Sequence, residues 1–262
     1  MRRLWLVVAL VATLLQIPHP AAAGTVTVAA AGDIARPTLS TPQQQTADLV
    51  TAFDPTTVFA LGDLQYENGE LANFQSSYDP SWGAFKSKTH PIPGNHDYGT
   101  TNAAGYYTYW GSAAGDPSKG YYSFDLGDWH VVALNTECTQ INCSAEKSWM
   151  KSDLAADGHL CQMVVYHRAN LKWPRKKAEA AGVDLALTAS RHVYERWAPE
   201  NGLLRLIVGT GGYSLGKLNS GAVVGIRAYG VVELTLSSSS YSWSFVDTSG
   251  DVRDSGAGSC HS

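Results

Sequence analysis

The chain has 262 residues, 44% of them hydrophobic, and a net charge of −4 at pH 7. This length and composition suffice for a large domain with a substantial core. Proteins that bind the nucleic-acid backbone usually carry a basic face, so the acidic balance predicts no nucleic-acid partner.

Residues 1–23 have the features of a cleaved signal peptide. Arg2 and Arg3 precede an apolar run over residues 4–15, and three alanines at 21–23 form a small-residue cleavage site. The run is too short to span a bilayer comfortably, and no later stretch reaches the required length. We therefore expect a secreted, extracellular protein whose mature chain, residues 24–262, is a single domain. Removing 23 of 262 residues leaves 239, and losing the two arginines changes the net charge from −4 to −6.

The cysteines predict two disulfides, as expected for an exported protein; they are Cys138, Cys143, Cys161 and Cys260. Three pairings are possible. We favour Cys138 with Cys143 and Cys161 with Cys260, because a cysteine so near the C-terminus otherwise has no evident role. A cysteine metal site is disfavoured because no close-set Cys-x-x-Cys spacing occurs.

The first half of the mature chain alternates apolar runs with helical patterns. Runs over residues 25–31 and 57–61 predict strands, and residues 42–53 predict a helix capped by Thr41. Residues 70–85 are helical in pattern, with an interruption at Asp79-Pro80. Residues 105–135 are aromatic and alternating, which predicts strands of a second sheet.

The second half continues this alternation and then becomes all-β. We expect helices over residues 144–156 and 174–181, and strands over 161–166 and 184–188. Residues 203–209 predict a further strand, and residues 230–236 and 241–246 predict a hairpin. Continuous apolar runs separated by helices indicate strands covered on both faces, hence a mostly parallel or mixed sheet.

Polar residues follow the ends of these strands one after another. They are Asp33, Asp63, Asn95 with His96, His167 and His192. Ligands bind beyond the carboxyl ends of such strands, so residues far apart in the sequence are expected to meet at one edge. Any one of them alone is more often a turn or a packed side chain; the succession of five favours a shared site.

Oxygen and imidazole donors without thiolate suit zinc, manganese or iron, and a pair of ions that share a carboxylate. Such a pair holds a phosphoryl group and lowers the pKa of a bridging water. Serine-centred catalysis has little support, because no Gly-x-Ser-x-Gly motif occurs.

These motifs resemble those of calcineurin-like metallophosphoesterases, and most closely the purple-acid-phosphatase-like branch of secreted bacterial phosphatases. They are Gly32-Asp33, the segments GDLQY (62–66), GNHD (94–97) and VVYH (164–167), and HVYER (192–196). The resemblance runs from about Ala29 to the C-terminus. It implies an α/β fold, a four-layer α/β/β/α sandwich of two mixed sheets. It also implies an exported phosphatase in which a metal-bound hydroxide attacks a small phosphorylated substrate.

By this resemblance, the first metal takes Asp33, Tyr66 and His192, and Asp63 bridges to the second, which takes Asn95 and His167. A phenolate ligand favours Fe(III), so iron with zinc or manganese is expected; the alternative for Tyr66 is a packed strand-end tyrosine. His96 is expected to orient the substrate or protonate the leaving oxygen.

The chain departs from the family pattern beside the second metal. The usual Gly-His-x-His reads Ala189-Ser190-Arg191-His192, so Ser190 replaces a histidine ligand and the second metal site is expected to be weak or empty. The usual His-His-Pro reads His167-Arg168-Ala169. Arg168 is assigned a catalytic role in binding substrate phosphate; the alternative is a solvent-facing salt bridge. A second hypothesis is therefore a catalytically impaired relative that binds phosphate or metal.

Overall fold

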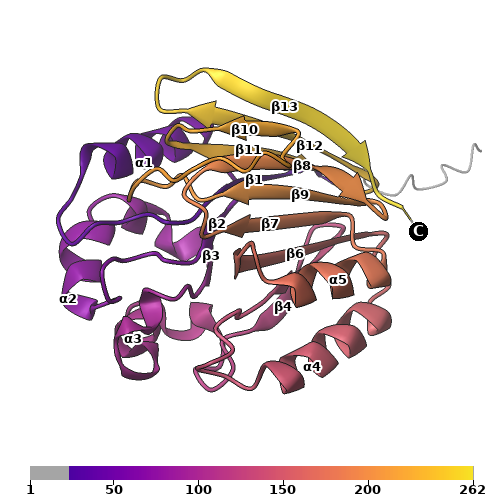
Figure 1. Cartoon of the computed structure of the whole chain (residues 1–262), viewed down its shortest axis with the longest axis horizontal. Helices are drawn as coiled ribbons and strands as arrows, with labels where there is room; N and C mark the ends of the chain where they lie inside the picture. The colour runs from indigo at the N-terminus through magenta and orange to yellow at the C-terminus, as the bar shows by residue number, and fades with distance from the viewer. Residues whose placement is uncertain (1–23, 262) are drawn as a thin grey trace, which may run out of the picture.

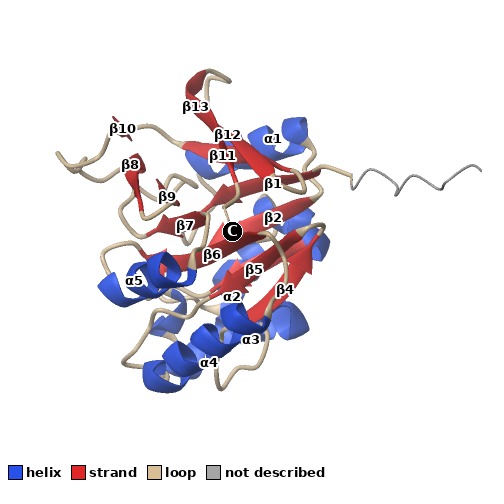
Figure 2. Ribbon diagram, turned by 90° about the vertical axis from the view of Figure 1, so that its right-hand side faces the viewer, coloured by secondary structure: helices blue, strands red, loops and turns tan. Residues whose placement is uncertain are grey.

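The computed structural model describes residues 24–261, so the signal-peptide prediction falls on residues outside the described part. Two mixed sheets face each other, with α1–α3 on one side of the molecule and α4 and α5 on the other (Figure 1). Figure 2 shows the strands of both sheets between these helices. The predicted fold class, an α/β sandwich of two mixed sheets, is confirmed.

The first sheet has six strands in the order β13-β12-β11-β1-β2-β3. The strands β1, β2 and β3 run parallel, and β11, β12 and β13 add antiparallel strands beside β1. Their bounds are β1 (Val26–Ala31), β2 (Thr57–Leu61), β3 (Thr89–Ile92), β11 (Gly230–Leu236), β12 (Ser240–Asp247) and β13 (Val252–Ser259).

The second sheet has seven strands in the order β10-β8-β9-β7-β6-β5-β4. The strands β5, β6, β7 and β9 are parallel, with antiparallel neighbours at both ends. Their bounds are β4 (Tyr122–Leu126), β5 (Trp129–Ala133), β6 (Cys161–Arg168), β7 (Leu185–Ala189), β8 (Tyr194–Glu200), β9 (Leu203–Val208) and β10 (Val224–Ile226).

The helices bury apolar faces against these sheets. They are α1 (Thr41–Phe53), α2 (Leu71–Asn73), α3 (Ala104–Trp110), α4 (Cys143–Ala156) and α5 (Lys172–Ala181). Met150 and Leu154 of α4 and Ala178 of α5 pack with Val164 and Ala186 of the second sheet. Every residue of β2, β5 and β7 is buried, as expected for strands covered on both faces. No helix among residues 24–261 is long and apolar enough to cross a membrane.

The aromatic segment was predicted wrongly in its first half and correctly in its second. Residues 104–110 form the helix α3 rather than a strand, because Tyr106, Tyr109 and Trp110 lie at helical spacing and all three are buried. Residues 122–126 and 129–133 form strands of the second sheet as expected, and these two strands, β4 and β5, pair as an antiparallel hairpin.

Smaller differences concern element ends. Helix α1 begins at Thr41, so its cap is Ser40 and the prediction of Thr41 was wrong. The expected break at Asp79-Pro80 is present between two short helical turns, Phe74–Tyr78 and Trp82–Lys88. A strand ending before Asn95 was expected without bounds, and it is β3. The strands β8, β10 and β13 were not predicted, because their polar or glycine-rich sequences lack a continuous apolar run.

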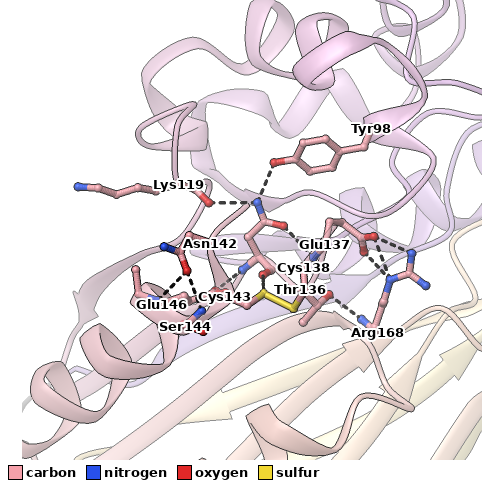
Figure 3. The surroundings of a disulfide bond; sticks show 12 residues. Tyr98, Lys119, Thr136, Glu137, Cys138, Asn142, Cys143, Ser144, Glu146 and Arg168 are labelled. Carbon is pink, nitrogen blue, oxygen red and sulfur yellow. Dashed lines mark hydrogen bonds and ion pairs between the residues drawn. A yellow bond between two sulfur atoms is a disulfide. The ribbon is translucent and has the colours of Figure 1, made fainter. Parts of the chain in front are cut away.

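Both favoured disulfide pairings are confirmed. Cys138 pairs with Cys143, closing a short loop before α4, and Cys161 pairs with Cys260, joining the first residue of β6 to the residue after β13 (Figure 3 shows the first pair). The second pair spans 99 residues and links the two sheets at their ends.

The two disulfides should contribute very unequally to stability. In the chain-entropy model a closed loop of about 100 residues contributes about 4.7 kcal/mol, whereas a loop of about six residues contributes about 2 kcal/mol. We expect Cys161→Ala/Cys260→Ala to lower the free energy of unfolding by about 4–5 kcal/mol and Cys138→Ala/Cys143→Ala by about half as much. Urea denaturation of the two variants beside the unchanged protein measures this; equal losses would contradict it.

Candidate metal centre

The predicted ligands converge between the two sheets, at the carboxyl ends of parallel strands. Asp33 and Asp63 follow β1 and β2 of the first sheet, and Asn95 lies three residues beyond the end of β3. From the second sheet, His167 lies near the end of β6 and His192 follows β7. The positional rule for open α/β sheets therefore holds here.

Asp33, Asp63 and Tyr66 form the buried centre of this group. The Tyr66 hydroxyl lies 2.7 Å from Oδ1 of Asp33 and 3.0 Å from Oδ2 of Asp63. The side chain of Tyr66 is fully buried, as is that of Asp33. His192 completes the group, with Nε2 lying 3.2 Å from Oδ1 of Asp33 and 3.3 Å from the Tyr66 hydroxyl.

His167 approaches Asp63 from the opposite sheet. Its Nε2 lies 3.1 Å from Oδ2 of Asp63, while Nδ1 lies 2.9 Å from the carbonyl oxygen of Leu61. Because a carbonyl only accepts, Nδ1 carries the proton and Nε2 is left facing the carboxylate. His167 sits at an irregularity in the pairing of β6 with β7, which turns its side chain out of the regular alternation.

The Gly94–Asp97 turn is held against Asp63. The backbone N–H of His96 donates to Oδ1 of Asp63 at 2.7 Å. Asp97 points back into the fold and accepts N–H bonds from Gly94 at 2.9 Å and Leu64 at 3.1 Å. Asp97 is therefore a structural organiser of the turn, a role that the motif alone did not reveal.

Four non-glycine residues at the strand ends have positive φ angles, between 50° and 62°: Asp33, Asp63, Ser190 and His192. Residues held in this region cost on the order of 1–3 kcal/mol each and persist only where surrounding contacts fix them. Here the contacts include the Ser190 N–H, which donates to Oδ2 of Asp33 at 2.9 Å. Strained backbone thus accompanies the polar cluster at both sheets.

The charges of the centre perturb one another. Burial raises the pKa of Tyr66 well above its ordinary value, and the Asp33 and Asp63 charges raise it further. Burial opposes the charged form of His167, but Asp63 outweighs it and raises the pKa of His167 to about 10. Burial, together with repulsion from Asp63, raises the pKa of Asp97 to about 8. A metal ion bound here would have to displace protons.

The residues present fit a metal. Donor atoms of Asp33, Asp63 and His167 all lie within 4.8 Å of one another, and all three residues are buried. Nε2 of His167 is buried and makes no hydrogen bond, although it faces a carboxylate. A buried imidazole nitrogen without a hydrogen-bond partner is what a metal ligand leaves when the ion is absent. Whether each of the six predicted ligands binds metal stays a prediction.

Ser190 and Arg168, which were expected beside the second metal, make their hydrogen bonds to other groups. The Ser190 hydroxyl accepts the N–H of Ala169 at 3.2 Å. Arg168 forms a two-pronged pair with Glu137, with Nε 2.8 Å from Oε1 and Nη2 2.6 Å from Oε2 (Figure 3). The Arg168 side chain is 43% exposed and that of Glu137 is 3% exposed. The guanidinium is thus fixed in place, as the salt-bridge alternative describes, while part of it faces solvent.

Three residues around Tyr66 were not foreseen. The Tyr213 ring stacks on that of Tyr66 at 3.5 Å, and its hydroxyl donates to Glu67 at 2.8 Å. Arg36 donates to the Tyr213 carbonyl oxygen and lies over the Tyr213 ring. Tyr213 belongs to the long loop after β9, where the sequence shows no motif, so only the folded chain reveals its place.

Comparison with solved structures identifies the fold. The purple acid phosphatase PPD1 of yellow lupin (Lupinus luteus) matches with a TM-score of 0.75 and 18% identity over 93% of this chain and 55% of that chain. GAP50, the anchor in the inner membrane complex of Plasmodium, matches with a TM-score of 0.66 and 14% identity over 91% of this chain and 90% of that chain. A dimetal phosphatase from Danio rerio matches with a TM-score of 0.60 and 10% identity over 88% of this chain and 98% of that chain.

The chain therefore has the metallophosphoesterase fold, and it spans about half the length of the lupin enzyme. No family model matches the sequence, and no curated protein matches it.

Gly94 should tolerate no side chain. A Cβ there would overlap the backbone nitrogen and Oδ1 of Asp63, neither of which can move without displacing this carboxylate. We expect Gly94→Ala to lower the free energy of unfolding by about 1–3 kcal/mol and to reduce bound metal. Gly24→Ala, where a Cβ meets nothing within 4 Å, is the control. Elemental analysis and thermal unfolding of both variants measure this, and identical behaviour would contradict it.

Proposed function

We propose that this protein is an exported metal-dependent phosphoesterase that hydrolyses small phosphate esters at a two-metal centre. The observation that carries the proposal is the position of Asp63. Its Oδ2 lies 3.0 Å from the Tyr66 hydroxyl and 3.1 Å from Nε2 of His167. One carboxylate oxygen thus adjoins a donor from each of the two metal sets, which is the arrangement of a bridging ligand.

The first metal would be held by Asp33, Asp63, Tyr66 and His192, and the second by Asp63, Asn95 and His167. When bound, such ions supply positive charge to phosphate oxygens and make a water molecule acidic enough to act as nucleophile. An oxygen-and-nitrogen donor set with a tyrosine favours iron with zinc or manganese. The acidic chain itself offers little other positive charge for a phosphate.

His96 is proposed to act on the substrate. Its Nδ1 donates to the carbonyl oxygen of Glu67 at 2.6 Å, and its ring lies 4.2 Å from that of Tyr66. With Nδ1 engaged, the Nε2–H of this half-buried ring in its protonated form can donate to a substrate oxygen or give it a proton. Arg168, held by Glu137, is proposed to bind substrate phosphate with the part of its guanidinium that faces solvent.

The runner-up is a catalytically impaired protein of the same fold that binds phosphate or metal. Ser190 motivates it, because a neutral hydroxyl already bonded to the Ala169 N–H is a poor replacement for an imidazole. The fold does not decide between the two, since one structure that matches is described as an anchor and two as phosphatases.

Metal removal tests the main proposal. We expect chelator-treated protein to lose hydrolysis of a chromogenic phosphomonoester and diester, and iron with zinc or manganese to restore it. Asp63→Asn should lower the restored rate by at least about 100-fold, because it removes the shared ligand. Asp48→Asn on the exposed face of α1 is the control and should behave like the unchanged protein. Equally poor hydrolysis by stripped and restored protein would overturn the proposal.

Restoring the missing histidine separates the two candidate functions. If the second site is impaired, Ser190→His should raise the bound metal by about one ion per chain and raise the rate by at least about tenfold. If Ser190 suffices, metal content and rate should stay unchanged. Ser220→His, which adds a histidine at an exposed loop position, controls for adventitious binding. Elemental analysis and initial rates are the measurements.

A further inference from the structure

A second group of metal-binding side chains lies away from this centre, at the opposite end of the second sheet. Asp125 and His130 face each other directly across the β4–β5 hairpin. Asp157 and His159 lie in the loop between α4 and β6. His130 is the second residue of β5, and this loop enters the first residue of β6, whereas His167 lies near the carboxyl end of β6.

One donor atom from each of the four residues lies within 4.8 Å of the others. Nδ1 of His130 is 2.8 Å from Oδ1 of Asp125 and 3.8 Å from Oδ1 of Asp157. Nδ1 of His159 is 2.6 Å from the same Asp157 oxygen. Ligand atoms about 2.0–2.2 Å from a tetrahedral zinc ion lie about 3.3–3.6 Å apart, so only small side-chain shifts separate this group from that geometry.

A second layer of hydrogen bonds orients these donors. Nε2 of His130 lies 2.8 Å from Oδ2 of Asp153, which leaves Nδ1 facing Asp125 and Asp157. Oδ2 of Asp157 accepts the Gln162 amide at 2.8 Å. A histidine that gives its other nitrogen to a carboxylate is the usual arrangement of a metal-bound imidazole.

The charge of the group lacks a cationic partner other than histidine. The side chains of Asp153 and Asp157 are only 17% and 7% exposed. Within residues 24–261, none of Asp125, Asp153 and Asp157 forms an ion pair with a lysine or arginine. Carboxylates withdrawn from water need a compensating positive charge, which a divalent ion would provide.

We propose that Asp125, His130, Asp157 and His159 form a structural Zn²⁺ site, with Asp153 holding the His130 ring. Two imidazoles with two carboxylates suit zinc, whereas Ca²⁺ needs six to eight oxygen ligands and Mg²⁺ takes oxygens alone. The ion joins the edge strand β4, the start of β5 and the loop before β6. It lies at the amino ends of the parallel strands, so its role is to stabilise the fold and not to act in hydrolysis.

The test separates this site from the metal centre by using the full mature chain with the Asp63→Asn substitution. Metal-stripped protein is titrated with Zn²⁺, and zinc per chain and thermal unfolding are measured. Asp125→Asn/His159→Gln is added to remove two ligands, of which Asp125 is exposed and His159 is partly exposed. We expect the added pair to remove one zinc per chain, to weaken zinc binding by at least about 100-fold and to abolish the zinc-dependent rise in Tm.

Asp128→Asn, which removes a carboxylate of the same hairpin that is not part of the group, is the matched control and should keep the zinc. If Asp63→Asn prevents folding, the same variants are compared in the unchanged chain, where the pair should lower zinc by one per chain and leave phosphoester hydrolysis unaltered. Equal zinc content and equal Tm rise with and without the added pair would overturn the proposal, as would an equal loss in Asp128→Asn. The group would then be an ion-pair network.

Discussion

The placement of two buried carboxylates side by side is the constraint on which this structure depends. Asp33 and Asp63 are both withdrawn from water, and both contact the hydroxyl of Tyr66. Burying like charges is unfavourable unless a cation or proton accompanies them. Histidines of the other sheet lie against both carboxylates, His167 against Asp63 and His192 against Asp33. The backbone at these strand ends is held at positive φ, and only a glycine fits at position 94 beside Asp63. The two sheets are therefore joined by the site as well as by their apolar core.

What could be predicted from the sequence was what local chemistry determines. Apolar runs that end in Gly-Asp or a histidine predicted the strands and also the residues that meet beyond them. Parallel strands place their carboxyl ends at the same edge of a sheet, so the residues that follow those ends come together. Contacts made through loops could not be predicted. Tyr213 contacts Tyr66 from a segment without a motif, and Glu137 contacts Arg168 from the residue just before the loop that the Cys138–Cys143 disulfide closes. Helix α3 was missed because a run of aromatic residues fits either period, and only burial of one helical face decides between them.

The two halves of the centre differ in how the chain supports them. The side chains of Tyr66, Asp33 and His192 each have a polar partner in or beside the centre. For Nδ1 of His192 this partner is the hydroxyl oxygen of Ser214, at 2.7 Å. On the His167 side, one nitrogen lacks a hydrogen bond, and Ser190 turns its hydroxyl to the backbone of Ala169. The guanidinium of Arg168 forms an ion pair with Glu137, which balances its charge. On this side, Ser190 therefore offers no imidazole, and its hydroxyl is already engaged with the backbone.

The second sheet uses its two ends for different purposes. At the carboxyl ends of β6 and β7, strained backbone and a bulge turn side chains toward the candidate metal centre, at a cost to stability. At the amino end of β6, the disulfide to Cys260 and the group around His130 hold the strand entrance, the edge hairpin and the end of α4 together. The buried strand β6 joins these two ends of the sheet. The same parallel register that gathers the candidate metal ligands at one edge therefore leaves the opposite edge free for residues that stabilise the fold.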